Sequence, residues 1–221
     1  MLKLYGFAVS NYFNMVKMAA ALKQIDCEDV ITYPNQTPEY LAISPTGKVP
    51  ALETNEGVLV ETNVILEYLD ENYPGIALYP KEPFQKARVK ELVKMIELYM
   101  ELPARRCHAE AFWGVPGEDI TKKEVKRALL NGIQAISRAA SFSPYIGGEQ
   151  ISAADIVFLY SADLAAKVAA KLFAIDLLAE APGAKELLAK LNEMPEAKVI
   201  AQARAEATPA FNAYLQKAFQ K

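Results

Sequence analysis

Two short motifs in the first third of the chain combine residue types that can hold a peptide-like ligand. The first is the run Lys48-Val49-Pro50, and the second is the pair Glu61-Thr62. The residue before a proline is restricted to extended geometry, and a proline is tolerated at the start of a strand. Val49 is therefore expected to keep its backbone N–H and C=O free to pair with an extended peptide along the sheet edge.

The pair Glu61-Thr62 stands where an apolar helical pattern begins. The first N–H groups of a helix have no partner within the helix, so together with the Thr62 hydroxyl they form a site for a carboxylate. The side chain of Glu61 is able to pair with an ammonium group. The two motifs together predict a ligand with an amino-acid head group at one end and a peptide backbone in the middle.

The elements that must position these motifs follow from the hydrophobic periodicity of the chain. The first part reads as strand 2–7, helix 11–24, strand 28–33, a loop, strands 51–54 and 58–60, and helix 62–72. A segment rich in proline, residues 74–83, predicts a linker. Every later pattern is helical: residues 84–112, interrupted by Pro103, and then 121–141, 152–173, 183–192, 196–206 and 209–219.

The chain resembles the glutathione transferase superfamily over essentially its whole length. The run Pro-Thr-Gly-Lys-Val-Pro-Ala-Leu at residues 45–52 and the Glu61-Thr62 pair look like the glutathione-binding signature of that family. The resemblance implies an α/β plus all-α fold, with a thioredoxin-like βαβ-ββα domain over residues 1–80 and an all-helical domain over residues 84–221. It also implies an enzyme that conjugates reduced glutathione to small electrophiles, with glutathione as co-substrate and no other cofactor.

In thioredoxin-like domains, the loop between the first strand and the first helix carries the redox dithiol. Here residues 10–13 are Ser-Asn-Tyr-Phe, which cannot form a disulfide. Lowering the pKa of a thiol by about two units from ~8.5 needs roughly 2.7 kcal/mol of anion stabilisation. One charge-assisted hydrogen bond supplies about 1.5–3 kcal/mol, and the helix dipole supplies roughly 0.3–1 kcal/mol. A hydroxyl at the helix N-terminus therefore suffices to hold a bound thiolate.

Three hydroxyls are candidates for that role. By resemblance to the serine-type classes, theta and zeta among them, Ser10 matches the thiol-activating serine, because it stands six residues before Val16. Tyr5 is the alternative, since other classes carry a catalytic tyrosine near the end of the first strand, and Tyr12 is the third candidate. The zeta pattern has Ser-Ser-Cys where this chain has Ser-Asn-Tyr, which argues against a maleylacetoacetate isomerase.

The resemblance also implies how glutathione is held. Glu61 and Thr62 would bind its γ-glutamyl head, Val49 its cysteinyl backbone and Lys48 its glycyl carboxylate. Thr62 stands where serine is usual, but it keeps the hydroxyl.

A proline within the predicted helix 84–112 suggests where the electrophile binds. Pro103 removes one i to i−4 hydrogen bond, so the helix is expected to bend and to leave the carbonyl of Tyr99 unpaired. In the family that this chain resembles, the electrophile pocket lies against this helix, although a bend that only fits the helix to its core is the alternative. Arg105 and His108 are expected to face water. The residues expected to line the pocket are Tyr12, Tyr99, Met100, Arg106, Cys107 and Trp113.

Composition excludes several other classes of function. A net charge of −3, with 52% hydrophobic residues, gives no electrostatic footprint for nucleic acid. The apolar region 153–179 carries Asp163, Lys167 and Lys171 on one helix face, which argues against a membrane span. Two cysteines and one histidine have no metal-ligand spacing, so no metal site is expected. With no secretory signal pattern, a cytoplasmic location is expected.

A homodimer is expected, mainly from the resemblance. The sequence adds that helices 62–72 and 84–112 hold more apolar residues than one face needs. These include Tyr68, Leu92, Met95, Ile96 and Tyr99.

The alternative function is a non-catalytic protein-interaction module, as in the starvation-type regulators and translation-factor subunits that resemble glutathione transferases. The Glu61-Thr62 pair and Ser10 favour the enzyme.

Overall fold

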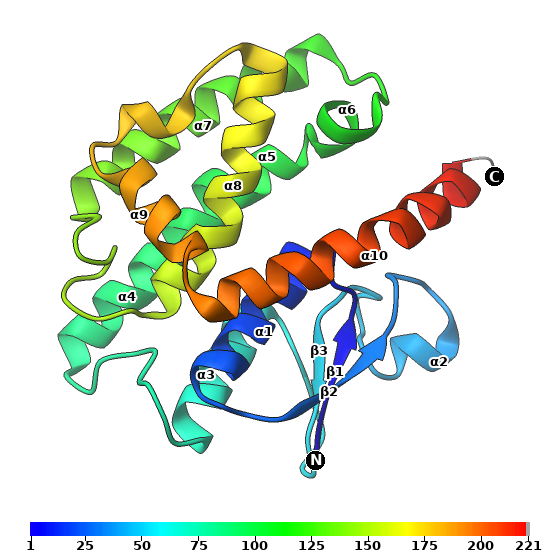
Figure 1. Ribbon diagram of the computed structural model, residues 1–221. Helices are drawn as coiled ribbons and strands as arrows, with labels where there is room; N and C mark the ends of the chain where they lie inside the picture. Colours follow the sequence, from blue (N-terminus) through cyan, green and yellow to red (C-terminus); the bar gives the residue numbers. More distant parts are fainter. Residues whose placement is uncertain (220–221) are drawn as a thin grey trace. The chain divides into compact units, whose positions relative to one another are not determined.

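The computed structural model describes residues 1–219, and its internal contacts divide the chain into two compact units (Figure 1). The first unit is Met1–Leu78 together with the chain from Glu193 onward, and the second is Tyr79–Asn192. The predicted helical domain covers the whole of residues 84–221, whereas the last helix belongs by its packing to the first unit. As functional domains, residues 1–80 and 84–221 remain a prediction.

A four-stranded sheet forms the centre of the first unit. Its strands are β1 (Leu2–Gly6), β2 (Cys27–Ile31), β3 (Ala51–Glu53) and β4 (Val58–Val60). They lie in the order β2-β1-β3-β4, with β1 parallel to β2 and antiparallel to β3. Side chains of β1 alternate between buried and half-buried, as expected of a strand with one face on the core. The predicted βαβ-ββα order is confirmed.

Two helices of the first unit pack together, α1 (Asn11–Leu22) and α3 (Thr62–Asn72). A third, α2 (Pro38–Leu41), was not predicted, because four residues are too few to show a helical period. Its start is nevertheless visible in the sequence as Thr37-Pro38. The Thr37 hydroxyl accepts a hydrogen bond from the Tyr40 N–H, and a proline is favoured at the first helical position.

The last helix, α10 (Pro195–Phe219), runs beside α1 (Figure 1). The prediction of two helices, 196–206 and 209–219, is wrong, because Pro209 lies inside one continuous helix. Proline removes the N–H that would bond the carbonyl of Ala205, four residues earlier. Both residues are exposed, so solvent can satisfy that carbonyl and the helix continues.

The second unit is entirely helical. Its elements are α4 (Pro83–Ile96), a π-helix η1 (Glu97–Glu101), α5 (Leu102–Arg105), α6 (His108–Trp113), α7 (Asp119–Ala139), α8 (Ala153–Phe173), a 3-10 helix η2 (Leu177–Glu180) and α9 (Ala184–Asn192). Helix α8 is buried over most of its length and packs against α4, α7 and α9. Its burial explains the apolar run that the sequence shows there.

The predicted single helix 84–112 is four elements in the structure. Widening of the backbone begins before the proline, in η1, where the Leu102 N–H bonds the Glu97 carbonyl five residues earlier. Pro103 then stands in the first turn of α5, where its missing N–H does little harm. A π-helical turn contains about one extra residue, so it rotates every later side chain relative to the pattern of an unbroken α-helix.

Beside this turn, α7 approaches the backbone of η1 closely at Gly132. A Cβ atom built on Gly132 would lie 2.3 Å from the carbonyl oxygen of Tyr99, so no larger residue fits without movement of the backbone. The carbonyl that the sequence analysis singled out therefore faces α7.

Helix α8 starts with a capping box formed by Ser152 and Asp155. The buried Asp155 carboxylate accepts hydrogen bonds from the Ser152 N–H, the Ser152 hydroxyl and the Ile146 N–H, each at 2.8 Å. Burial raises the pKa of the Asp155 carboxyl, although these hydrogen bonds act against the rise.

We expect Ser152→Ala to destabilise the protein by about 1 kcal/mol, because it removes an N-cap hydroxyl. For a chain of this size that corresponds to a fall in Tm of roughly 2–4 °C, measurable by calorimetry. Ser161→Ala is a matched control on the same helix. Its buried hydroxyl has no hydrogen-bond partner among the described residues, so its loss should leave Tm unchanged or raise it. Lost turnover at an unchanged Tm in Ser152→Ala would contradict a purely structural role.

Candidate active site

The strand register brings the sequence motifs to the same end of the sheet, where β1 and β4 end and β3 begins. Ala51, the first residue of β3, lies opposite Tyr5 in β1 and opposite Val60 in β4. At this same end of the sheet, the chain leaves β1 toward Ser10, leaves β4 into Glu61, and enters β3 from Val49. The hydroxyl loop, the acidic pair and the Val49-Pro50 dipeptide therefore gather within one unit.

Ser10 is the N-cap of α1, with extended backbone angles of φ −76° and ψ 123°. Its side-chain oxygen accepts a hydrogen bond from the Phe13 N–H at 3.4 Å, which is long for such a bond. Accepting this bond uses a lone pair and leaves the hydroxyl proton available for donation. The half-buried Ser10 hydroxyl thus stands beside the positive end of a helix dipole, as anion stabilisation requires.

The loop before Ser10 is fixed by a buried amide that the sequence analysis missed. Asn14 is only 1% exposed, and its Nδ2 donates to the carbonyl of Ala8 at 2.9 Å. The Ser10 N–H donates to the Phe7 carbonyl at 3.0 Å, and the Ser10 carbonyl accepts from the Asn14 N–H at 3.0 Å. A polar residue on the buried face of a predicted amphipathic helix was the signal that could have identified Asn14.

Tyr5, the alternative to Ser10, has its hydroxyl committed to another group. It donates to the Glu53 carboxylate at 2.5 Å, and Lys3 pairs with the same carboxylate at 2.9 Å. The hydrogen bond to Glu53, followed by burial, raises the pKa of the Tyr5 phenol. Tyr12, the third candidate, is half-buried in the first turn of α1.

The pair Glu61-Thr62 opens α3. Glu61 has φ 70° and ψ 114°, a backbone conformation that residues other than glycine seldom adopt and that clusters at ligand sites. Its exposed side chain does not cap the helix. The side chain of Thr62, the first helical residue, is only 6% exposed. The carboxylate site at the Thr62 hydroxyl and the first N–H groups of α3 stays a prediction.

The loop that carries Lys48 and Val49 is held from two sides. The Lys48 carbonyl accepts hydrogen bonds from the Tyr40 hydroxyl at 3.0 Å and the Ser44 hydroxyl at 2.8 Å, while its ammonium side chain is exposed. The peptide bond between Val49 and Pro50 is cis. Tyr40 and Ser44 were not predicted, because contacts to a backbone carbonyl leave no recognisable spacing in the sequence.

A second contact ties this loop to the segment after β2. The Asn35 N–H donates to the Gly47 carbonyl at 3.1 Å. Gly47 has φ +65°, and a Cβ atom there would meet the Asn35 carbonyl oxygen at 2.3 Å. Only glycine therefore fits at this position of the signature run.

The residues expected to line the electrophile pocket are not equivalent. Met100 is fully buried in the core of the second unit, so in this structure it offers no surface to a substrate. Tyr99 is 48% exposed, and the Trp113 ring lies 4.6 Å from the His108 ring. Cys107 is buried, and burial raises the pKa of its thiol.

The two arginines near Pro103 have different surroundings. Arg105, expected to face water, binds the buried carboxylate of Glu101 at 2.7 Å. Arg106, expected in the pocket, is exposed and pairs with the exposed Glu124 at 2.8 Å. The helical period expected through residues 97–106 leaves out the extra residue of η1, which explains the different face of Arg105. The place of Arg106 at the electrophile pocket stays a prediction.

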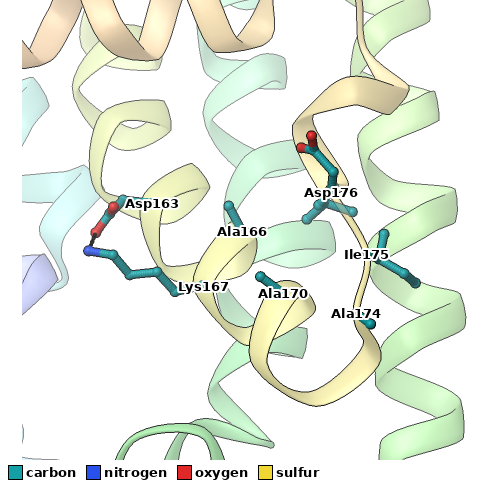
Figure 2. Close-up of a pocket in the computed structure, with 8 residues that line it drawn as sticks. Asp163, Ala166, Lys167, Ala170, Ala174, Ile175 and Asp176 are labelled. Carbon is teal, nitrogen blue, oxygen red and sulfur yellow. Dashed lines mark hydrogen bonds and ion pairs between the residues drawn. The ribbon is translucent and has the colours of Figure 1, made fainter.

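A hollow of about 460 Å³ lies in the second unit, against the C-terminal half of α8 (Figure 2). It is lined by Asp163, Ala166, Lys167, Ala170, Ala174, Ile175, Asp176 and Leu177. No predicted site residue is among them. The Asp163 carboxylate pairs with Lys167 at 2.7 Å, and Asp176 pairs with Lys185. Its acidic groups therefore already have cationic partners.

Two absences hold for the described residues, 1–219. None of the helices there is long and apolar enough to cross a membrane. In the same part of the chain, no three side chains of His, Cys, Asp or Glu are grouped so that they could hold a metal ion.

Known proteins share the sequence and fold of this chain. The family model for the N-terminal domain of glutathione S-transferases matches residues 4–77. A maleylacetoacetate isomerase of Pseudomonas aeruginosa is 27% identical over 73% of this chain and 82% of that protein. The crystal structure of a maleylacetoacetate isomerase from Methylobacterium extorquens AM1 with bound malonate and GSH has a TM-score of 0.69 at 27% identity, covering 91% of this chain and 95% of that chain.

A glutathione S-transferase of Pseudomonas putida F1 is considerably more similar. It is 47% identical over 211 residues, which are 96% of this chain and 96% of that protein. An identity of this size over almost the full length, together with the shared fold, shows that the chain belongs to the glutathione S-transferase family of enzymes.

Proposed function

We propose that this enzyme transfers reduced glutathione to small electrophilic molecules through a thiolate held by the Ser10 hydroxyl. The observation that carries the proposal is the position of Ser10, whose side-chain oxygen accepts the capping bond from Phe13 and keeps its own proton to donate. Tyr5 is the weaker candidate, because its hydroxyl already donates to Glu53.

In this proposal, glutathione lies at the end of the sheet where the three motifs meet. Glu61 pairs with the ammonium of the γ-glutamyl head, and Thr62 with the first turn of α3 binds its carboxylate. The backbone of Val49 pairs with the cysteinyl unit, while the exposed Lys48 reaches the glycyl carboxylate. The hydrogen bonds that fix the Lys48 carbonyl support this arrangement, because they hold the adjacent Val49 in place.

The chemistry then needs no side-chain base. The thiol of bound glutathione releases its proton to solvent, because the Ser10 hydroxyl and the α1 dipole stabilise the remaining anion. The thiolate attacks an electrophilic atom and forms a new bond to sulfur. In a displacement the leaving group departs with the electron pair of the broken bond, and in an addition the resulting anion takes a proton from solvent.

The remaining expectations belong to the same proposal: a homodimer in the cytoplasm with a role in detoxification. Structural support for the dimer is smaller than the sequence suggested, because Leu92 and Ile96 are buried within the second unit. Tyr99 remains exposed, and Met95 and Tyr68 are half-buried. Light scattering at working concentration tests the oligomeric state.

Titration with glutathione at neutral pH, followed by ultraviolet difference absorbance of the thiolate, tests the central step. We expect a thiolate signal that saturates with binding and titrates about two units below a free thiol. Turnover of a chromogenic aryl halide should accompany it. Binding without any thiolate signal would contradict the proposed mechanism, and absence of binding would contradict the assigned site.

A further inference from the structure

Four aromatic rings join the last helix to the loops of the candidate site. Phe211 of α10 stacks on Phe7 with ring centroids 4.9 Å apart, and Tyr214 stacks on Tyr33 at 4.2 Å and an interplanar angle of 13°. The ring centroids of Phe7 and Tyr33 are 5.0 Å apart, and those of Phe211 and Tyr33 are 5.9 Å apart. We call these four residues the aromatic stack.

The first connection runs from Phe7 to the candidate catalytic hydroxyl. Phe7 follows β1 directly, and its carbonyl accepts the hydrogen bond from the Ser10 N–H at 3.0 Å. The side chain of Phe7 is 8% exposed, so its position depends on what packs against it. Phe211 covers this ring and thereby restrains the loop that ends at Ser10.

The second connection runs from Tyr33 to the loop that carries Lys48 and Val49. Tyr33 is two residues before Asn35, whose N–H bonds the Gly47 carbonyl at 3.1 Å. The Tyr214 hydroxyl donates to the Pro34 carbonyl at 3.5 Å, at the outer limit for such a bond. Tyr214 therefore contacts both the ring and the backbone of the segment that supports this loop.

We propose that Phe211 and Tyr214 are positioning residues of the glutathione site: the last helix fixes the loop of Ser10 through Phe7 and the loop of Val49 through Tyr33. The inference rests on the proposed function, because it assigns what sets the geometry of that site. Neither residue touches the reacting atoms. Their effect is on the thiolate pKa through Phe211 and on glutathione affinity through Tyr214.

Phe211→Ala should raise the pKa of bound glutathione by about one unit and lower kcat at neutral pH about tenfold. An aromatic pair is a moderate interaction, and a displacement of the hydroxyl by a fraction of an ångström is enough to weaken its bond to sulfur. Tyr214→Ala should instead raise the Kd and KM for glutathione about tenfold, with a smaller change in kcat.

The experiment compares these variants with conservative and remote controls in the full-length chain. Phe211→Tyr and Tyr214→Phe keep the rings and should restore most of the wild-type pKa and Kd, since Tyr214→Phe loses only the long hydroxyl contact to Pro34. Gln216→Ala, on an exposed position of the same helix, should change neither. All are assayed well below their Tm by the thiolate difference spectrum and by glutathione titration, since a merely structural role would lower Tm without moving either quantity.

Ser10→Ala separates failure of this inference from failure of the proposed function. If Ser10→Ala shifts the thiolate pKa but Phe211→Ala and Tyr214→Ala change only Tm, the aromatic stack is structural and the inference is wrong. If neither Ser10→Ala nor Phe211→Ala shifts that pKa, the proposed role of Ser10 is wrong as well.

Discussion

Ser10→Ala is expected to raise the pKa of bound glutathione and to lower kcat at neutral pH by roughly 10- to 150-fold. This range corresponds to the loss of one hydrogen bond to a charged group, about 1.5–3 kcal/mol. Glutathione affinity should change little, because the hydroxyl contacts only the thiolate. The folded state should lose little, since the cap bond to Phe13 is long, at 3.4 Å.

The pH dependence distinguishes this effect from general damage. A higher thiol pKa lowers the thiolate fraction at a fixed pH, so the activity of Ser10→Ala should recover as pH rises through the new pKa. Tyr5→Phe is the matched control and should leave the thiolate pKa unchanged, because the Tyr5 hydroxyl donates to Glu53. A silent Ser10→Ala beside a strongly impaired Tyr5→Phe would reverse the assignment.

Thr62→Val is expected to have the opposite signature, with the Kd for glutathione raised roughly 10- to 100-fold and kcat at saturation nearly unchanged. Valine has almost the same volume but lacks the hydroxyl that we place on the γ-glutamyl carboxylate, a charged acceptor. Thr62 is 6% exposed. In the valine variant, water therefore has little access to the γ-glutamyl carboxylate and cannot replace the lost hydroxyl. Isothermal titration and steady-state kinetics measure the two quantities.

Thr62→Ser serves as the control, because it keeps the hydroxyl and removes only a methyl group. It should bind glutathione within about threefold of the wild-type enzyme, since one methyl group is worth less than 1 kcal/mol. If Thr62→Val also binds with wild-type affinity, Thr62 only opens the helix.

Local sequence signals predicted the strands of the first unit and its helices α1 and α3 well. Strand 58–60 and helix 62–72 have the predicted bounds, because a turn and a clear apolar period define both. A turn joins β3 to β4, with the Thr54 N–H bonded to the Gly57 carbonyl at 2.8 Å. The π-helix η1 could not be predicted, because nothing in the residues 97–101 distinguishes a wide turn from an ordinary one.

The candidate site divides in the same way. Ser10, Glu61 and Thr62 were identifiable, because a helix start and a motif mark them in the sequence. Asn14, Tyr40 and Ser44 support the site through bonds to backbone carbonyls, and such bonds have no fixed spacing. Phe211 and Tyr214 were harder still, since their partners Phe7 and Tyr33 lie far away in the chain.

The division of the chain into units has a consequence for biosynthesis. The first unit is discontinuous, because it includes the chain from Glu193 onward. A ribosome releases residues 1–78 long before it makes α10, whereas the second unit is complete as soon as Asn192 emerges. The sheet and its glutathione loops must therefore wait for the last segment of the chain before Phe7 and Tyr33 are covered. We expect nascent chains stalled before α10 to contain a protease-resistant second unit and a still sensitive first one.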